Sequence, residues 1–536
     1  MRQAMARGCR QSLARWCRPS LAAAVAVLPL ALALQPASAA EALFLDLHQQ
    51  GPTASRTLAA HLLPADADRG QPIAVFVAAL LPQGSWFVLG PAGWQALAEA
   101  APAPLLQLQA ADSHSVTLAA GIDVAGLVGT RVFAGYGRAD SASGGAWNEM
   151  LAAGRHREIG TLRAAPSLQF STPASVAACP ADAAAPLFGT APVDPADFIA
   201  LRPLGFQSLP IHVFPAKHGA FSMTPLGATP SPKPVRAPAR ATVREMIEVR
   251  NPATGGGNFQ VFMFPCRDVR LYFGHLATVS QKLRAAFDAG TPRCDSLPPG
   301  DLVTCRRDGL DVVLEEGEVF AHGPDSAGVD FGLMDVRRPA GGFVVPEHYD
   351  AYYPFWQAPL AYFGADVQAV LAARTGSVFG ARRRSAEPVG GSHAQDVAGT
   401  AQGNWFVPGR YWVDSGGGGA ALLALVGDYA DPAQPLIAHG GALPGWPAGL
   451  YAYAPRDDGG TVNRRFADIT ADGRVHCLQG FLSGSSPGEI GLSPAAGALM
   501  LQLLNPLALR AQWAAGRDCG ALDGWAFGAG AAVFVR

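Results

Sequence analysis

Short apolar runs broken by Gly, Pro, Asn and Asp recur along most of the chain. In the first third, residues 73–81 and 85–89 are two such runs, and the Pro-Gln-Gly turn between them indicates a β-hairpin. Several short strands separated by turns are typical of two packed sheets, so the pattern predicts a β-sandwich-like module at residues 42–164. Trp86 and Trp94 are expected in its core.

A second series of apolar runs lies within residues 194–340. The segments 259–264 and 271–276 are dense in Phe, Val and Leu and are interrupted or followed by Gly and Pro. This favours a compact antiparallel β domain. Apolar side chains recur every four positions from Val279 to Phe287, so a helix that packs by one face is expected there.

Residues 165–193 are rich in Ala, Pro, Ser and Asp without regular periodicity, which is typical of a linker. The next segment, 195–202, begins with Pro and carries an acid in its first turn, so a short helix is expected. Residues 346–536 are predicted to form a β-rich α+β region with helices at 367–374 and 497–509. The chain is therefore predicted to be mainly β and multidomain.

Residues 1–39 have the features of a signal peptide. They carry five arginines and no acid, an apolar core at residues 21–34, and the small residues Ala37-Ser38-Ala39 at a candidate cleavage point. This apolar core is too short to span a bilayer comfortably, although a retained anchor is the alternative. We expect an exported protein, periplasmic or extracellular, with no stable membrane span after signal removal.

The charge of the chain argues against one class of partner. The sequence has 40 Lys and Arg against 42 Asp and Glu, and the leader accounts for five of the basic residues. Because the mature chain is mildly negative, nothing in its charge favours nucleic acid as a partner.

Six cysteines lie beyond the leader, and export favours disulfides among them. Six cysteines allow many connectivities, and sequence alone does not choose among them. Closeness along the chain favours Cys294 with Cys305. The same argument favours Cys477 with Cys519 and leaves Cys179 for Cys266.

Three short patterns follow one another in the central segment. They are the strand entry Pro234 to Pro238, the Tyr-x-x-His-Leu run from Tyr272 to Leu276, and the Gly-x-Val run that starts at Gly317 and reaches a Gly turn. In this order they resemble the lysostaphin-like zinc endopeptidases, the duplicated hybrid motif family, whose small β domain cuts peptide bridges in bacterial cell walls. The resemblance covers roughly a quarter of the chain and implies a lysostaphin-like β domain at 194–340.

The resemblance also implies site residues, and two of them are replaced. The family binds zinc through a His, an Asp four positions later and the second His of a His-x-His pair, whose first His is catalytic. Here the candidate His218 is followed by Ser222, and the His-x-His pair reads Gly328-Val329-Asp330. The chain keeps His218 and His275 and has Asp330 at a ligand position.

Zinc is therefore a possible cofactor, with no other cofactor expected. The candidate ligands are His218, Asp330 and His212, and His275 is the candidate catalytic group. His275 is also the alternative third ligand. A zinc site needs three protein ligands and an open position, where the metal activates a water molecule.

Three functions stay open. The first is an exported protein whose lysostaphin-like domain binds cell-wall polymer or a peptide strand without cleavage. The second is a zinc metallopeptidase with an altered ligand set that acts on peptidoglycan, and the third is a structural or adhesive surface protein. The replacements at Ser222 and Gly328 favour the first, which is not an enzyme.

Overall fold

The computed structural model gives a mainly β protein, so the predicted fold class is confirmed. The strands form two sheets in the first part of the chain, two in the central part and a closed barrel in the last part. The structure describes residues 43–44, 46–51, 53–98, 101–110, 114–141, 145–164, 168–170, 172–252, 256–297, 302–324, 326–412, 419–484, 493–522 and 524–536.

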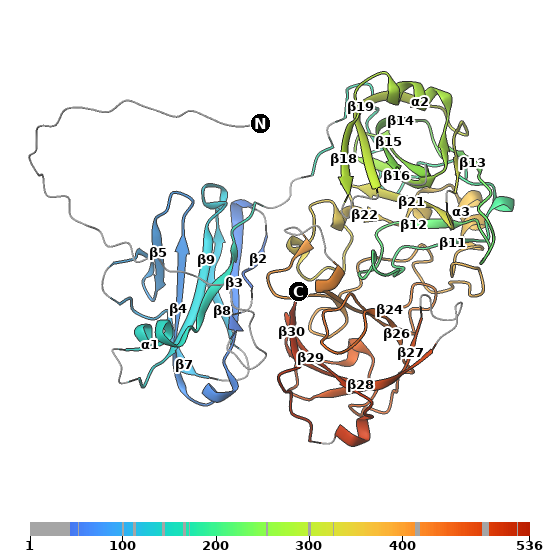
Figure 1. Cartoon of the computed structure of the whole chain (residues 1–536). Coiled ribbons are helices and arrows are strands. Elements are labelled where there is room, and N and C mark those ends of the chain that lie inside the picture. Colours follow the sequence, from blue (N-terminus) through green and yellow to red (C-terminus); the bar gives the residue numbers. More distant parts are fainter. Residues whose placement is uncertain are drawn as a thin grey trace, which may run out of the picture. The chain divides into compact units, whose positions relative to one another are not determined.

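The first part contains two antiparallel sheets (Figure 1). One is built from β1 (Leu43–Phe44), β2 (His48–Gln50), β3 (Arg56–Leu63) and β8 (His114–Ile122). The other contains β4 (Pro72–Leu80), β5 (Trp86–Gly90), β6 (Gly93–Ala96), β7 (Leu106–Gln109), β9 (Arg131–Arg138) and β10 (His156–Thr161).

These two sheets share one hydrophobic core, as the sandwich prediction requires. Leu58 and Leu62 of β3 pack there with Val75 and Val77 of β4. The helix α1 (Ala146–Ala153) covers the opposite face of β4, where its residue Met150 joins Phe76.

Two details of this part concern the predicted hairpin and its tryptophans. β4 and β5 pair antiparallel, with Leu80 opposite Trp86, so the hairpin is confirmed. The prediction for Trp94 is wrong, because this side chain is 37% exposed on the edge strand β6. Trp86 is half-buried. Alternation along a strand says which residues share a face, but not whether the end of a sheet is covered.

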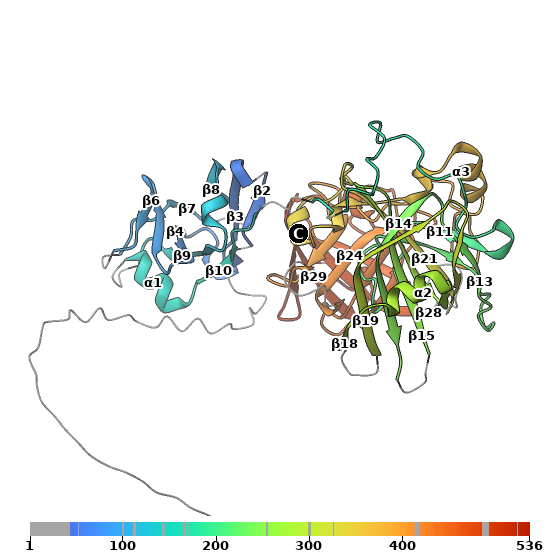
Figure 2. The same cartoon turned by 90° about the horizontal axis from the view of Figure 1, so that it is seen from above.

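The central part is organised around a nine-stranded sheet, seen from above in Figure 2. Its strands are β11 (Ala200–Arg202), β12 (Gly219–Ser222), β14 (Ala241–Arg250), β15 (Gly257–Cys266), β16 (Val269–Leu276), β18 (Arg293–Leu297), β19 (Leu302–Leu314), β21 (Gly328–Asp335) and β22 (Trp356–Gln357). A smaller sheet contains β13 (Lys233–Arg236), β17 (Thr278–Val279) and β20 (Val319–Gly323).

One face of the large sheet is the core of this part. Val261, Leu271 and Phe273 point into it, and the smaller sheet and the helix α2 (Gln281–Asp288) close it from the other side. The predicted helix is thereby confirmed, with Phe287 buried. The alternate residues along β15 and β16 point to the other face, which we call the second face of the sheet.

The sheet also takes in residues from beyond the central segment. β22 pairs with β21, and the helix α3 (Ala365–Ala372) adds Leu371 to the same core. The helix expected at 367–374 is thus present with a start two residues earlier. The segment that follows the central domain along the sequence packs on its sheet.

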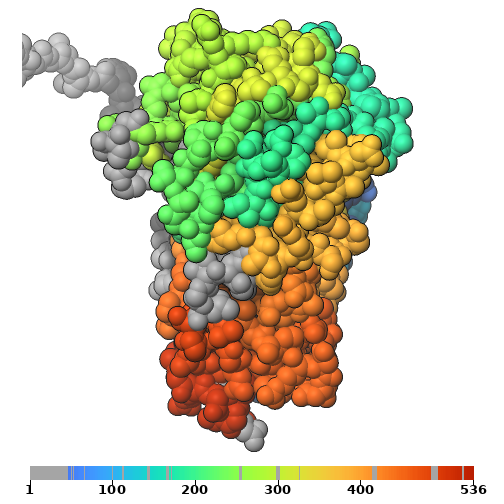
Figure 3. All heavy atoms as spheres, turned by 90° about the vertical axis from the view of Figure 1, so that its right-hand side faces the viewer, coloured from blue at the N-terminus to red at the C-terminus, as the bar shows by residue number. Residues whose placement is uncertain are grey.

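A closed antiparallel barrel occupies most of the last part. Its strands are β23 (Gly403–Phe406), β24 (Leu422–Gly427), β25 (Pro435–His439), β26 (Gly449–Ala452), β27 (His476–Ser483), β28 (Ser493–Asn505), β29 (Ala508–Ala515) and β30 (Ala532–Val535). On its outer side, Phe214 packs edge-on against Phe406 at 5.0 Å between ring centres. Figure 3 shows one face of the molecule as spheres, with the barrel in orange and red.

Two predicted helices are wrong. Residues 497–509 lie in β28 and β29, because Leu499 and Leu501 face the barrel interior while Ala498 and Met500 pack on its outside. A strand that is buried on both faces has no alternating pattern, so it resembles a buried helix in sequence. Residues 195–202 form only a 3-10 turn, Pro195–Asp197, before β11.

Three disulfides join the pairs that closeness along the chain favoured. They are Cys294–Cys305, Cys477–Cys519 and Cys179–Cys266. The last of these holds the segment before the central sheet onto the end of β15. Among the described helices, none has the length and apolar character needed to cross a membrane.

Candidate functional site

Neighbouring strands of the central sheet bring the predicted site residues together. His218 directly precedes β12, His275 lies near the end of β16, and Asp330 lies in β21, between these two strands. The register places Asp330 opposite Ala220 on one side and opposite Gly274 on the other. Residues more than a hundred positions apart therefore meet on the second face of the sheet.

The carboxylate of Asp330 is the centre of this group. Its Oδ1 lies 3.6 Å from Nδ1 of His218, and its Oδ2 lies 3.7 Å from Nε2 of His275. The hydroxyl of Tyr272 donates a hydrogen bond of 3.2 Å to Oδ2. The His212 ring stands edge-on to His218 at 5.2 Å between ring centres. We call these five residues the Asp330 cluster.

Sequence reasoning assigned no role to Tyr272, although it begins the Tyr-x-x-His-Leu pattern. The signal that identifies it is spacing along β16, since Tyr272 and Gly274 share one face of the sheet. A Cβ atom at Gly274 would lie 2.2 Å from the Tyr272 hydroxyl and 3.1 Å from Oδ2 of Asp330. Only glycine at this position lets the hydroxyl reach the carboxylate.

A second glycine makes room above β21. A Cβ atom at Gly332 would lie 2.4 Å from the Trp356 ring and 3.0 Å from Cβ of His218. The flat backbone at this point therefore allows His218 and Trp356 to lie directly on the sheet. The packing of the Asp330 cluster therefore depends on Gly274 and Gly332, where the missing Cβ leaves room for a neighbouring side chain. We call these two positions the glycine seats.

The backbone at His275 is in the left-handed region, with φ of 58°. Among the described residues only one other non-glycine residue, Asn463, has positive φ. Phe259 pairs with Leu276 and Val261 with Phe273, so β16 has one more residue than β15 at this point and forms a bulge. Bulges and left-handed residues cost energy and are frequent at functional sites, where they redirect a side chain.

The histidines of the cluster differ in exposure and in charge. Burial lowers the pKa of His218, and the carboxylate of Asp330 acts in the opposite direction. Burial lowers the pKa of His212 to about 3, with a further contribution from His218. Both rings are therefore neutral at neutral pH. The His275 side chain is 46% exposed, so it is the member of the cluster that a ligand reaches first.

A hydrogen bond to the backbone fixes the orientation of the His218 ring. Nδ1 lies 3.1 Å from the carbonyl oxygen of Gly219. A carbonyl can only accept a hydrogen bond, so Nδ1 carries the proton and donates it. This nitrogen is then not available as a metal ligand.

The residues at the two replaced positions do not fit a zinc site of the expected kind. Ser222 offers a buried hydroxyl in place of a carboxylate, and zinc prefers thiolate, imidazole and carboxylate ligands. A Cβ atom at Gly328 would lie 2.4 Å from the carbonyl oxygen of Phe221, so this position has no room for a side chain. Across the described ranges, no three His, Cys, Asp or Glu side chains are grouped as metal ligands.

The zinc ligand set His218, Asp330 and His212, and the catalytic role of His275, therefore remain predictions. We derive no reaction step from a metal at this site. The arrangement nevertheless supplies one carboxylate, one accessible imidazole and one phenol hydroxyl within hydrogen-bonding reach of a common ligand.

Aromatic side chains continue the second face away from the cluster. The Tyr272 ring lies 5.1 Å from Phe262 and 6.1 Å from Trp356, measured between ring centres. The guanidinium of Arg270 lies 4.2 Å from the centre of the Phe262 ring and pairs with Glu245. The face therefore offers ring surfaces next to hydrogen-bonding groups.

Lys217, the residue before His218, is already engaged by the protein. Its Nζ lies 3.6 Å from Asp350 and within 5.2 to 5.4 Å of the ring centres of Trp356 and Tyr353. Because Lys217 is held by these groups, it anchors the segment that positions His218. It is not the charge partner of Asp330.

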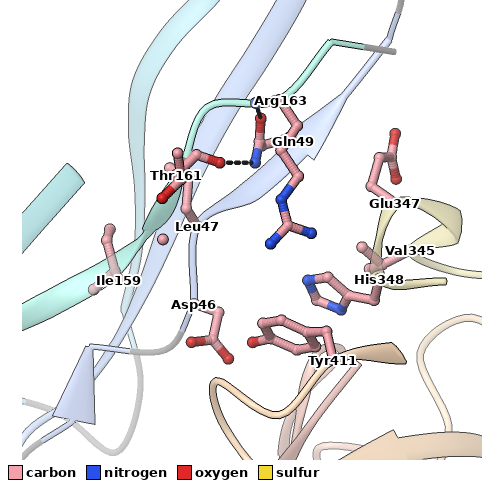
Figure 4. Close-up of a pocket in the computed structure, with 11 residues that line it drawn as sticks. Asp46, Leu47, Gln49, Ile159, Thr161, Arg163, Val345, Glu347, His348 and Tyr411 are labelled. Atoms are coloured by element: carbon pink, nitrogen blue, oxygen red, sulfur yellow. Dashed lines mark hydrogen bonds between the residues drawn. The ribbon is translucent and has the colours of Figure 1, made fainter. Parts of the chain in front are cut away.

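Two cavities lie elsewhere. Figure 4 shows a pocket of about 20 Å³ lined by Leu47, Gln49, His348 and Tyr411, among others, which has room for about one water molecule. His348 stacks on Tyr411 at 3.8 Å and is fully buried, which is typical of a structural histidine. A larger hollow of about 370 Å³ lies beside α3, and five of its eleven lining residues are alanines.

Comparison with known protein families gave no match, and comparison with curated proteins gave no significant similarity either. The function is therefore argued from the geometry of the site.

Proposed function

We propose that this is an exported protein whose central sheet binds a cell-wall polymer or a peptide strand at the Asp330 cluster without cleaving it. The observation that carries the proposal is the meeting of His218, His275 and Asp330 on one face, combined with the residues at the two replaced positions. The polar groups needed to hold a ligand are present. At the two replaced positions, the resembled family's Asp and His are Ser222 and Gly328 here.

The contrast between Gly328 and Asp330, two residues apart at the start of β21, supports binding over cleavage. At Gly328 the strand is pressed against β12, and any side chain would meet the backbone of Phe221. Two residues further, Asp330 and its partners remain reachable through the exposed His275 ring. A site that cleaves a peptide needs an activated nucleophile as well as a place for the substrate. The Asp330 cluster supports the second requirement.

The chemistry of the second face fits a ligand with both polar and apolar surfaces. The Asp330 carboxylate accepts hydrogen bonds, the exposed imidazole of His275 offers ring nitrogens, and Phe262 and Tyr272 present ring faces. Sugar rings and peptide units both combine amide or hydroxyl groups with apolar faces. This combination supports a wall polymer or a peptide strand as the ligand class.

Export belongs to the same proposal. Three disulfides are compatible with an oxidising compartment outside the cytoplasm. The basic and apolar leader at residues 1–39 has the composition of a signal peptide. A periplasmic or extracellular location would bring the Asp330 cluster into contact with the cell wall.

Sedimentation with purified, insoluble wall sacculi tests the proposal. The wild type should sediment with the sacculi, and His275→Ala and Asp330→Asn should each weaken binding by about three- to tenfold, the value of one hydrogen bond. His322→Ala is the matched control, because this exposed histidine lies in β20 of the smaller sheet and should leave binding unchanged.

The same experiment separates the alternatives. Release of soluble wall fragments together with one zinc per chain, both lost in His218→Ala, would support the metallopeptidase alternative. Equal sedimentation of all variants would show that the Asp330 cluster is not the contact, and would favour a structural or adhesive role of the flanking β parts.

A further inference from the structure

The core of the barrel includes a large side chain that comes from a loop rather than from a strand. Trp446 lies in the connection 440–448 between β25 and β26 and is only 4% exposed. Its ring is parallel to Trp513 at 4.5 Å and lies 4.2 Å from Tyr451 and 4.7 Å from His439, measured between ring centres. One indole is therefore enclosed by rings that three strands supply.

Two rings of this enclosure lie against glycines of the barrel. A Cβ atom at Gly497 would lie 2.2 Å from the Trp513 ring, and one at Gly449 would lie 3.0 Å from the Tyr451 ring. We call Trp513, Tyr451 and His439 the ring cup, and its walls are held in place by β25, β26 and β29.

A hydrogen bond attaches the loop to the ring cup: the Tyr451 hydroxyl donates it to the carbonyl of Pro447, at 2.6 Å. Within the loop, the Trp446 amide donates one of 3.3 Å to the carbonyl of Leu443. Gly441 and Gly445 both have positive φ, and Pro444 and Pro447 lie between and beside them. Trp446 and Leu443 are the two large apolar side chains that the loop inserts.

The indole packs against the apolar surface of the cup but forms no hydrogen bonds with its polar groups. Among the described residues, Nε1 of Trp446 is buried without a hydrogen-bond partner. His439 is fully buried, and burial lowers its pKa to about 4, so its neutral ring can donate and accept hydrogen bonds. The Tyr451 hydroxyl is bound to the loop itself and is released if the loop leaves.

We propose that the ring cup is a binding site for a sugar ring, and that the 440–448 loop occupies it with Trp446 when no ligand is bound. A pyranose presents an apolar face to Trp513 and a polar edge to His439 and Tyr451. In the closed state the Tyr451 hydroxyl is bonded to Pro447, and the indole forms no hydrogen bond with His439. Once the loop leaves, an aromatic ring without polar substituents would leave both groups without a hydrogen bond. The site is separate from the Asp330 cluster, and the proposal stands without the proposed function.

Competition between the loop and the ligand for the ring cup determines how much a loop variant should raise the apparent affinity for the ligand. A ligand that binds only when the loop is out has its apparent affinity reduced by the fraction of molecules in that state. If the open state is about a tenth of the population or less, removal of the plug should tighten binding by about tenfold or more. Trp446→Ala removes the plug. Leu443→Ala weakens the loop and leaves the three rings of the cup in place.

Calorimetric titration of the full chain with a soluble tetramer of N-acetylglucosamine tests the proposal. Trp446→Ala should bind the tetramer at least about tenfold more tightly than the wild type, and Leu443→Ala should bind it more tightly by a smaller factor. Adding Trp513→Ala to Trp446→Ala should abolish the gain. Trp94→Ala is the control for unspecific stacking, because this exposed tryptophan lies in β6, in the first part of the chain. It should leave the affinity for the tetramer unchanged.

Two results would overturn the proposal. The first is tetramer binding by both loop variants no tighter than by the wild type, with hydrogen exchange of the barrel strands showing that each variant is folded. The second is binding by Trp446→Ala that persists after Trp513→Ala, because the sugar would then bind outside the ring cup.

Discussion

Replacing Gly328 tests the packing on which the non-catalytic interpretation depends. A Cβ atom at this position would lie 2.4 Å from the carbonyl oxygen of Phe221, whereas ordinary contact begins near 3.4 Å. β12 and β21 would have to separate by about 1 Å to accept one methyl group, and overpacking of this kind costs about 1–3 kcal/mol. We therefore expect Gly328→Ala to lower the free energy of unfolding by about 2 kcal/mol.

Chemical denaturation and hydrogen exchange of the β12 and β21 amides measure this loss. Gly341→Ala is the matched control, because nothing lies within 4 Å of the Cβ it would add and no positive φ strains it. Gly328→His, which restores the residue of the resembled peptidases, should destabilise the sheet at least as much as Gly328→Ala. If Gly328→Ala is as stable as the wild type, β12 and β21 are not pressed together, and the argument against a second catalytic histidine fails.

Two further predictions concern pH and disulfides. His212 has a pKa of about 3 in the folded protein against an ordinary value of 6.5, so the unfolded chain takes up the proton first as pH falls, and stability is lost between pH 6.5 and about 3. His212→Gln should reduce the loss of unfolding free energy between pH 6 and 4 by up to ~2 kcal/mol in denaturation experiments, and an unchanged pH dependence would mean that His212 is not buried. The Cys179–Cys266 bond closes a sequence separation of 87 and the Cys294–Cys305 bond one of 11. Replacing the first pair by Ser should therefore cost about 2 kcal/mol more than replacing the second, and equal losses would contradict the chain-entropy argument.

The sequence predicts those elements that carry a clear turn signal or a one-sided apolar pattern. The Pro-Gln-Gly turn marks the hairpin of β4 and β5, and the helix α2 has one buried face, so both are found where the sequence indicated them. The strand β28 is apolar on both faces, so its pattern could not be distinguished from that of a helix. Trp94 lies at the edge of a sheet, and sequence alone does not tell which edge stays uncovered.

The candidate site was accessible to sequence reasoning for a different reason. The order of short motifs, rather than any local pattern, singled out His218, His275 and Asp330, and the structure places both histidines within 3.7 Å of the Asp330 carboxylate. The glycine seats could not be found in this way. Their importance lies in what a Cβ atom would meet across the sheet, and this depends on register and on side chains from distant segments.

Register also explains why the two replaced positions belong together. Ser222 and Gly328 are direct partners in the ladder between β12 and β21, so a change at one alters the space at the other. The tight pairing at Gly328 removes room for a catalytic side chain at this end of β21. Asp330 points to the same face two residues further, where Gly274 leaves the carboxylate open to Tyr272 and His275. On the proposal of binding without cleavage, the two functions depend on positions two residues apart in one strand, and a substitution at Gly328 would have to open the ladder before it could supply a catalytic side chain.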